Sequence, residues 1–258
     1  MPRDNKTALI QKIAKQACVT FRGLRKSSPE ANGGNEPAGV NDQGELISLV
    51  TAVRAADLKI APRKSRSGSG AAPVTYMHIC ETDVFSMGVF LLRSGASIPL
   101  HDHPGMNGML KVLYGKVRVR CFDKLEGNAA DGVLPPFDPP LGPPQAASVW
   151  RAALHSVAVH GESGGPCLLT PVRDNLHHIE AVDGPAAFLD ILAPPYNPDD
   201  GRDCHYYKVL RTAAGGDTGG GRTGEGEEGE EEAWLLEIPQ PEDFWCGGEP
   251  YPGPAVSV

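Results

Sequence analysis

The sequence predicts an all-β barrel or jelly roll with one or two helices before it. The 258 residues include 31 glycines and 24 prolines, residues that start turns and end regular elements. Short runs rich in β-branched and aromatic residues lie between these turn signals. Many short strands separated by turns are typical of barrels and jelly rolls, and one such domain can reach about 250 residues.

The first quarter of the chain predicts helices. A first helix is expected over about residues 5–22 and a second over about 45–56, because apolar residues recur there at helical spacing. Residues 27–44 between them are rich in Gly, Ser, Asn and Pro and predict a flexible loop. The apolar positions are Leu9, Ile10, Ile13, Ala14 and Ala17 in the first helix, and Leu46, Leu49, Val50 and Val53 in the second.

From residue 74 onward the pattern changes to short strands. The predicted strands cover residues 74–80, 84–92, 97–103, 108–114, 116–122, 148–153, 155–160, 167–170, 176–182 and 186–193. Strand-like residues return at Trp234. We divide the chain into a helical extension with a flexible loop (1–73), a barrel core (74–212) with a Pro/Gly-rich insertion (123–147), a disordered Gly/Glu-rich linker (213–232) and a C-terminal segment that packs on the barrel (233–258).

Bulk composition limits the classes of function. The net charge of −8 argues against a nucleic-acid partner, and no apolar run approaches the ~18 residues of a membrane-spanning helix. The six cysteines are scattered and no secretory signal precedes them, so we expect mostly free thiols in the cytoplasm. Residues 1–26 are basic and somewhat amphipathic, which leaves a mitochondrial presequence as the alternative to a helix packed on the barrel. We expect a monomer without a membrane partner.

His101 and His103 carry the strongest chemical signal. Two histidines one residue apart on a strand project from the same face, so their rings can converge on one metal ion. Neutral imidazole suits iron, zinc, copper and nickel. Asp102 lies between them and should point to the opposite face. The alternative interpretation is a pair of solvated or core histidines.

The residues around this pair resemble the first cupin motif. Gly95, His101, His103, Gly108 and Gly115 stand at the spacing of that motif. Gly108 occupies the place where many cupins have a metal-binding glutamate. The resemblance therefore implies a metal site made of histidines alone.

A third histidine is expected from His177 or His178. The segment from Gly165 to His177 resembles a degraded second cupin motif, in which Arg173 replaces a glycine and the histidine comes one place late. Adjacent strand residues face opposite ways, so only one of the two should enter the site. The motif spacing favours His177.

Longer blocks resemble the family of cysteamine dioxygenases and plant cysteine oxidases. The blocks are Pro73–Ile79, His101–Met106, Leu110–Gly115, Asp174–His177, Gly184–Tyr196 and Gly201–Tyr207. The resemblance implies a cupin barrel that holds Fe(II) on His101, His103 and His177 and adds O2 to a thiol. In the family this reaction turns cysteamine into hypotaurine, or an N-terminal cysteine of a protein into its sulfinic acid, a step that can feed N-degron proteolysis. Segments 27–45, 123–148 and 213–232 show no such likeness.

Four further residues are candidates for the chemistry. Asp190 is a carboxylate within an apolar strand, so it needs either a structural hydrogen-bond partner or a role beside the metal. Tyr196 follows Pro194 and Pro195, and the resemblance puts both residues near the site. Cys204 and Tyr206 share a face if extended, so a thioether cross-link between them is one interpretation and a buried thiol in a turn is the other. Whether Cys18 and Cys246 pair is left open.

The sequence analysis thus predicts an iron-dependent thiol dioxygenase whose substrate has an amine next to a thiol. Selection of free cysteine would need an arginine for its carboxylate, and no arginine has a clear inward phase within the matching blocks. One alternative is a zinc or nickel cupin acting as an isomerase or hydrolase. Another is a cupin that binds a ligand or a partner without turnover.

Overall fold

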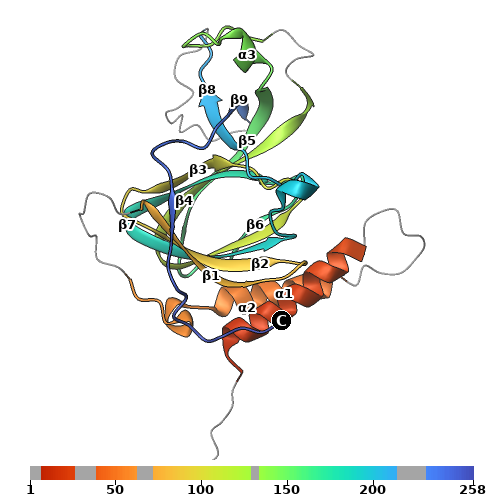
Figure 1. The fold of residues 1–258 in the computed structure, drawn as a ribbon, viewed down its shortest axis with the longest axis vertical. Helices are drawn as coiled ribbons and strands as arrows, with labels where there is room; N and C mark the ends of the chain where they lie inside the picture. The colour runs from red at the N-terminus through yellow and green to blue at the C-terminus, as the bar shows by residue number, and fades with distance from the viewer. Residues whose placement is uncertain (1–6, 27–38, 63–71, 129–133, 214–230) are drawn as a thin grey trace, which may run out of the picture.

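The structure is a computed structural model that describes residues 7–26, 39–62, 72–128, 134–213 and 231–258. Its helices are α1 (Leu9–Lys26), α2 (Gly39–Ala52), the 3-10 helix η1 (Ala55–Leu58), α3 (Pro143–Ala146) and the 3-10 helix η3 (Pro198–Asp200). Its strands are β1 (Val74–Glu81), β2 (Ser86–Leu92), β3 (Ser97–His101), β4 (Asn107–Asn128), β5 (Val149–Gly161), β6 (Cys167–Leu169), β7 (Leu176–Ala193), β8 (Tyr206–Leu210), β9 (Glu231–Ile238) and β10 (Cys246–Gly248). The predicted all-β barrel with two N-terminal helices is confirmed (Figure 1).

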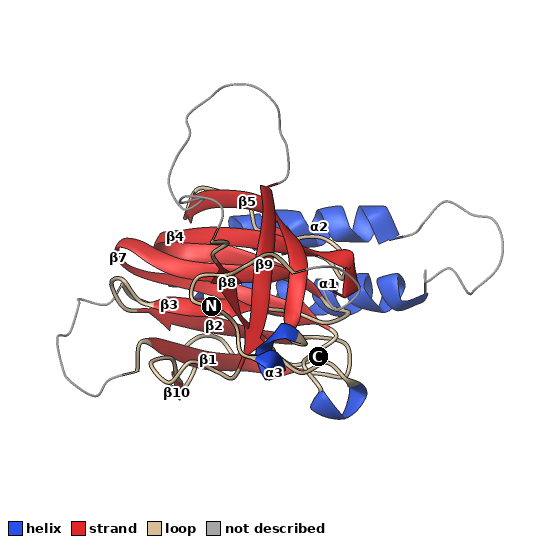
Figure 2. Ribbon diagram, turned by 90° about the horizontal axis from the view of Figure 1, so that it is seen from above, coloured by secondary structure: helices blue, strands red, loops and turns tan. Residues whose placement is uncertain are grey.

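Two long strands, β4 and β7, form the central part of the barrel wall. They pair antiparallel along most of their lengths, from Asn107 opposite Ala193 to Phe122 opposite Leu176. The C-terminal half of β7 also pairs with β2, and its N-terminal half with β3. The wall closes through β8, β9 and β5, which connect β3 back to β4. Figure 1 looks into this barrel, and Figure 2 shows its strands from above.

Strands β4, β5 and β7 were each predicted as two separate strands. In the structure, each is one continuous strand with a bend or bulge at the predicted break. Gly115 has φ +73°, and a Cβ there would lie 2.4 Å from the carbonyl oxygen of Pro185, so glycine is required where β4 and β7 bend together. Gly184, at φ +135°, marks the matching bend in β7. In β5 the pairing with β4 shifts by one residue between Leu154 and Ser156, which is a β-bulge. The predicted breaks are therefore corrected to continuous strands.

The two long helices lie against the outer face of the sheet that contains β1 and β2 (Figure 1). Helix α2 begins at Gly39 rather than near residue 45, because its first turn docks on α1. The Thr20 hydroxyl and the Gln16 amide both donate to the Asp42 carbonyl, at 2.9 and 3.2 Å. Tertiary contacts thus extend the helix into a segment whose glycines predicted a loop.

Alternation along β7 separates the helix-covered face from the barrel interior. Leu189 and Ile191 belong to the cluster that packs against α1 and α2. Phe188 belongs to the interior cluster, and Asp190 lines an interior cavity. This register decides which side chains can reach a site inside the barrel.

Several predicted boundaries also need correction. Strand β3 ends at His101, two residues before its predicted end, because the chain turns at His103 and the Met106 amide bonds its carbonyl. Strand β4 continues to Asn128, within the predicted insertion, because it pairs there with β5. Strand β9 starts at Glu231, within the predicted disordered linker, because it pairs with β5. The predictions for residues 27–38 and 214–230 lie outside the described residues.

In the described part of the chain, no helix has the length and apolar character needed to cross a membrane.

Candidate metal centre and the adjoining cavity

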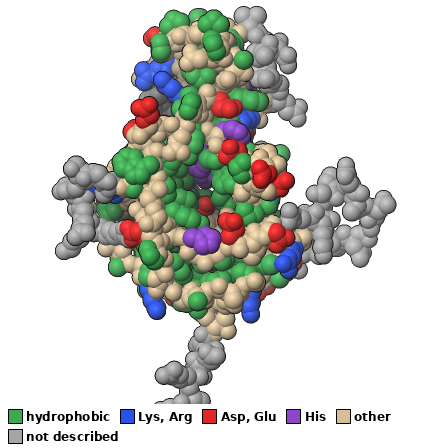
Figure 3. Space-filling view, viewed as in Figure 1, with side chains coloured by type: hydrophobic (Ala, Val, Ile, Leu, Met, Phe, Trp, Pro, Cys, Tyr) green, Lys and Arg blue, Asp and Glu red, His purple; other side chains and the backbone are tan. Residues whose placement is uncertain are grey.

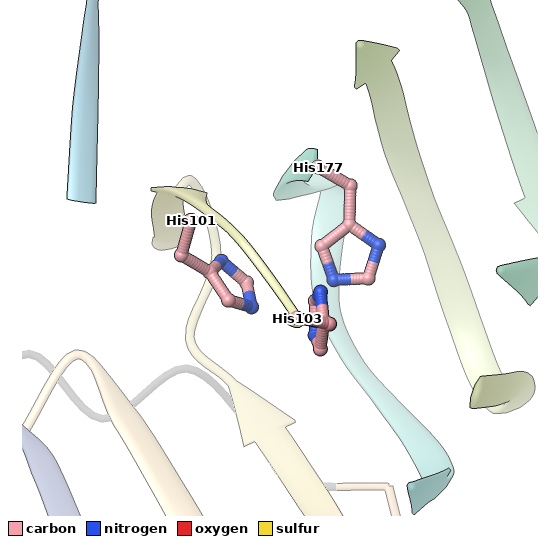
Figure 4. Close-up of side chains that lie close together, drawn as sticks. All are labelled: His101, His103 and His177. Atoms are coloured by element: carbon pink, nitrogen blue, oxygen red, sulfur yellow. The ribbon is translucent and has the colours of Figure 1, made fainter. Parts of the chain in front are cut away.

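Three histidines converge inside the barrel. His101 is the last residue of β3, His103 lies in the turn that follows, and His177 on β7 pairs directly with His101. Their ring centroids are 4.6 to 4.8 Å apart, and one nitrogen from each ring lies within 4.8 Å of the others (Figure 4). The structure therefore brings together the three histidines that the sequence predicted as metal ligands.

Backbone carbonyls orient two of these rings. His101 Nδ1 lies 2.8 Å from the Pro99 carbonyl, and His103 Nδ1 lies 2.8 Å from the Asn175 carbonyl. Each carbonyl accepts the Nδ1 proton, which leaves the Nε2 lone pair for a ligand. The Asn175 side chain also donates to the His103 carbonyl at 2.8 Å and accepts from its amide at 3.2 Å. Asn175 thus fixes both the ring and the backbone of His103.

Burial keeps the three rings neutral. Desolvation lowers the pKa of all three histidines, most clearly to about 3 for His103, where the neighbouring His101 adds to the effect. A neutral imidazole is the form that binds a metal. Three such nitrogens with no carboxylate in the cluster fit a transition metal that keeps open coordination positions. His178 is only partly buried and is not in this cluster.

Asp102 points away from the three rings, as the strand pattern predicted. Its carboxylate accepts hydrogen bonds from the Tyr207 hydroxyl at 2.7 Å, the His205 amide at 2.9 Å and the Lys124 ammonium at 3.3 Å. Lys124 also donates to Tyr207 at 2.7 Å and lies over the Trp150 ring. We call Asp102, Lys124, His205 and Tyr207 the Asp102 clasp. It ties the segment that carries His101 and His103 to β4 and β8.

A cavity of about 430 Å³ opens inside the barrel and is lined by residues other than the three histidines. Figure 3 shows the hollow in this face of the molecule. Tyr196 joins the two, because its side chain lines the cavity and its ring lies 5.7 Å from the ring of His103. The other lining residues are Tyr76, Glu81, Ser86, Gly88, Phe90, Asp190, Leu192, Cys246, Gly247 and Gly248. Among the residues that the structure describes, the lining thus contains two carboxylates and no lysine or arginine.

Asp190 and Tyr196, the predicted catalytic residues, both face this cavity. Burial raises the pKa of Asp190 to about 7, and within the described residues its carboxylate has no hydrogen-bond partner. The Tyr196 hydroxyl donates to the Asp102 carbonyl at 2.7 Å. Burial raises the pKa of Tyr196 well above its usual range, so the phenol stays protonated.

Cys204 lies between two tyrosines. Its thiol lies within interaction range of the hydroxyls of both Tyr196 and Tyr206, and burial raises the pKa of the thiol to about 11. The pair Cys204 and Tyr206 is therefore in contact, whereas the cross-link itself stays a prediction. Cys18 lies on α1 and is buried in the core cluster, Cys246 is exposed and lines the cavity, and both are free thiols.

A second group of polar side chains was not expected from the sequence. Asp123, His155 and Asp174 lie together on the barrel wall, with His155 Nδ1 2.5 Å from Asp174. The Arg173 guanidinium contacts the other ring nitrogen of His155, so this histidine already has partners on both nitrogens. We regard the group as a hydrogen-bonded network of the wall.

Sequence reasoning missed the residues that support the site. Asn175 fell inside a matching block, where only the following histidine drew attention. Tyr76 and Tyr207 also fell inside matching blocks, but nothing local showed what they would contact. Lys124 carries no local signal, because it becomes a partner of Asp102 only when the barrel closes. Gly88 had no signal other than its place in a strand.

The fold and the three histidines define a class of protein, the cupin barrels with a histidine-lined metal centre. The PCO_ADO family model matches residues 49–256, and the chain belongs to this family. A 2-aminoethanethiol dioxygenase from Homo sapiens is 55% identical over 99% of both chains, and one from Mus musculus is 56% identical over the same shares. Plant cysteine oxidase 1 from Arabidopsis thaliana is 30% identical over 57% of this chain and 45% of its own length.

Proposed function

We propose that this protein is an iron(II)-dependent thiol dioxygenase that acts on aminothiols. Its substrates are cysteamine, which becomes hypotaurine, and proteins with an N-terminal cysteine, which become sulfinic acids. Both atoms of O2 are added to the thiol sulfur, so the reaction consumes no other reductant. The observation that carries this proposal is the set of three neutral histidines beside an acidic cavity. The names of the 2-aminoethanethiol dioxygenase and cysteine oxidase relatives support it.

Iron(II) fits the residues present. Three imidazole nitrogens without a carboxylate leave a site whose remaining charge can come from the substrate thiolate. When bound, the iron would supply open coordination positions for the thiolate and O2, while the thiol sulfur itself supplies the four electrons that reduce O2. The carbonyls of Pro99 and Asn175 hold His101 and His103 ready for it.

The cavity favours a cation and has no partner for a carboxylate. Its two carboxylates, Asp190 and Glu81, attract the ammonium group of an aminothiol. Recognition of free cysteine would need a lysine or arginine in the lining, and the structure describes none there. We expect cysteamine and peptides that begin with cysteine to react, and free cysteine to react poorly.

The size of the cavity favours a peptide as well as a small thiol. A cavity of about 430 Å³ lies within the range of roughly 300–1,000 Å³ that is usual for ligand pockets, and cysteamine would fill only part of it. Gly247 and Gly248 of β10 line it without side chains, which leaves room for a chain to pass. A substrate protein could thus place its N-terminal cysteine inside and its second residue near β10.

Two measurements test the proposed function. Anaerobically purified protein should contain iron. Zinc or nickel in its place would favour the hydrolase or isomerase alternative. Under air, cysteamine and a Cys-initiated peptide should each gain two oxygen atoms by mass spectrometry. Iron-loaded protein that leaves saturating thiol unchanged would instead favour a binding module. We further propose that the protein acts in the cytoplasm as a monomer.

A further inference from the structure

Tyr76 is a residue of the cavity that the proposed function does not use. It lies on β1, diagonally across from Gly88 on β2, and Gly88 pairs with Asp190 on β7. All three line the cavity. The geometry places the Tyr76 phenol on β1 and the Asp190 carboxylate on β7, the two strands that flank β2, with Gly88 of β2 between them.

Gly88 allows the Tyr76 ring to lie flat across the sheet. A Cβ at this position would come within 2.2 Å of the ring and 2.4 Å of the hydroxyl oxygen. Any larger residue would therefore push the phenol away from Asp190. The other side of the ring is fixed by Phe90, whose centroid is 4.9 Å away.

The polar atoms of Tyr76 and Asp190 face the same space without bonding each other. Within the described residues, neither side chain has a hydrogen-bond partner, and burial and the nearby charge of Asp190 both raise the pKa of Tyr76. Both side chains are partly exposed and line the cavity. A ligand that displaces water from this cavity must therefore supply new partners for the phenol and the carboxylate.

We propose that Tyr76 and Asp190 together form the subsite for the substrate's ammonium group. This inference rests on the proposed function and deepens it, because it names the residue that distinguishes an aminothiol from a neutral thiol. The ammonium has three donors and no acceptor, so it can donate to the Asp190 carboxylate and to the Tyr76 oxygen at once. The rings of Tyr76 and Phe90 offer it π-faces in addition.

The experiment compares two thiols that differ only at this group. Cysteamine carries an ammonium where 2-mercaptoethanol carries a hydroxyl. Their dissociation constants are measured by anaerobic equilibrium dialysis against iron-loaded protein, so no turnover is needed. Tyr76→Phe removes one hydrogen bond to a charged group and should weaken cysteamine binding about 10-fold, with little change for 2-mercaptoethanol. Gly88→Ala should act in the same way by displacing the ring.

Tyr251→Phe is the matched control. It also removes one hydroxyl, but Tyr251 packs against the helix-covered core and does not line the cavity. It should leave both constants unchanged. Equal weakening of the two thiols by Tyr76→Phe, or no weakening, would overturn the subsite, and this variant decides the question even if Gly88→Ala does not fold.

The outcome separates the subsite from the reaction. Selective loss of cysteamine binding supports the subsite even if the wild-type protein oxidises no thiol under air, in which case only the proposed function fails. If the wild-type protein oxidises cysteamine but Tyr76→Phe binds both thiols as before, the function stands and the subsite is rejected.

Discussion

Asp102 and Asp190 are two carboxylates within the wall of one barrel, in opposite surroundings. Asp102 is 3% exposed and accepts hydrogen bonds from Tyr207, Lys124 and the His205 amide. Asp190 faces the cavity, and the described residues give it no hydrogen-bond partner. A buried carboxylate costs free energy unless it is paired and hydrogen-bonded. The hydrogen-bonding capacity of Asp102 is thus used by other residues of the protein, whereas the Asp190 carboxylate is available to a ligand.

The same contrast divides the barrel wall around the site into two sides. On the inner side, the rings of His101, His103 and His177 lie close together (Figure 4), and Asp190 lines the cavity. On the outer side, the members of the Asp102 clasp bond one another. We infer that substitutions on the inner side change metal binding and turnover, and that substitutions on the outer side change stability first.

The sharpest test uses two adjacent histidines on opposite sides of β7. His177→Ala should lose the bound metal, and activity should fall by at least the roughly 100-fold upper range seen when groups around a metal are removed. His178→Ala should keep both, because its ring lies outside the cluster. Iron content by mass spectrometry of the two variants measures this. Loss of iron from His178→Ala with retention in His177→Ala would reverse the assignment.

A substitution at the open carboxylate should reduce turnover without removing the metal. Asp190→Asn keeps the size of the side chain but removes the charge that faces the cavity. We expect full iron content and a rate lower by about 10–100-fold. Tyr196→Phe should behave in the same direction, because its hydroxyl bonds the Asp102 carbonyl and contacts Cys204. Unchanged rates in both variants would make these residues structural.

The pH dependence should follow the ionisation of Asp190. Burial raises the pKa of this carboxyl to about 7, so only part of the free enzyme carries the charge at neutral pH. The value of kcat/KM for cysteamine should rise as pH passes through about 7, since this ratio reports groups of the free enzyme. In Asp190→Asn this rise should disappear.

The same pKa predicts a change in stability with the opposite sign. The folded-state pKa of Asp190, about 7, lies above the usual value of about 3.9 in an unfolded chain. Between these values the folded-state carboxyl binds more protons, so the contribution of Asp190 to stability should fall as pH rises through the window. The lowered pKa values of the three buried histidines act in the opposite direction, so wild type and Asp190→Asn are compared at each pH. In urea unfolding of metal-free protein, the free energy of unfolding of wild type should decrease relative to that of Asp190→Asn as pH rises.

The outer side should respond mainly in stability. Lys124→Met leaves the buried Asp102 carboxylate without its cation, which should lower the free energy of unfolding by about 1–3 kcal/mol. Lys116→Met is the control, because its ion pair with Asp183 is exposed and such pairs contribute about 0–1 kcal/mol. Equal effects in urea unfolding would show that the clasp contributes no more than a surface pair.

The sequence predicted the inner side of the site better than the outer side. His101, His103 and His177 were assigned because two histidines of one segment and a third at motif spacing carry their own signal. The orientations of Asp102 and His178 followed from strand alternation alone. Local pattern is sufficient where each cooperating residue lies in a motif of its own, even when the motifs are far apart in sequence.

The clasp and the cavity could not be predicted in this way. Lys124 and Tyr207 are 22 and 105 residues from Asp102 in sequence, and only the closure of the barrel brings them to it. The bends at Gly115 and Gly184 were interpreted as strand ends, because a glycine that permits a bend and one that ends a strand look alike in sequence. The unexpected start of α2 likewise depends on its contacts with α1.

The smallest expected effect concerns Cys204, which lies where the two sides meet. Its thiol contacts Tyr206 and Tyr196, and O2 can oxidise a thiol and a phenol ring to a thioether. The S–H and one ring C–H bond break, an S–C bond forms, and O2 takes up two electrons and two protons.

Aerobic, iron-loaded protein should thus yield a joined Cys204–Tyr206 peptide lighter by two hydrogens. Tyr206→Phe should abolish it and Tyr196→Phe should not, because the favoured partner shares the extended segment. Cys204→Ser should cost no more than about 10-fold in kcat, the lower end of losses for groups around a metal. A cross-link that persists in Tyr206→Phe but vanishes in Tyr196→Phe would assign the bond to the other tyrosine and extend the chemistry to the inner side.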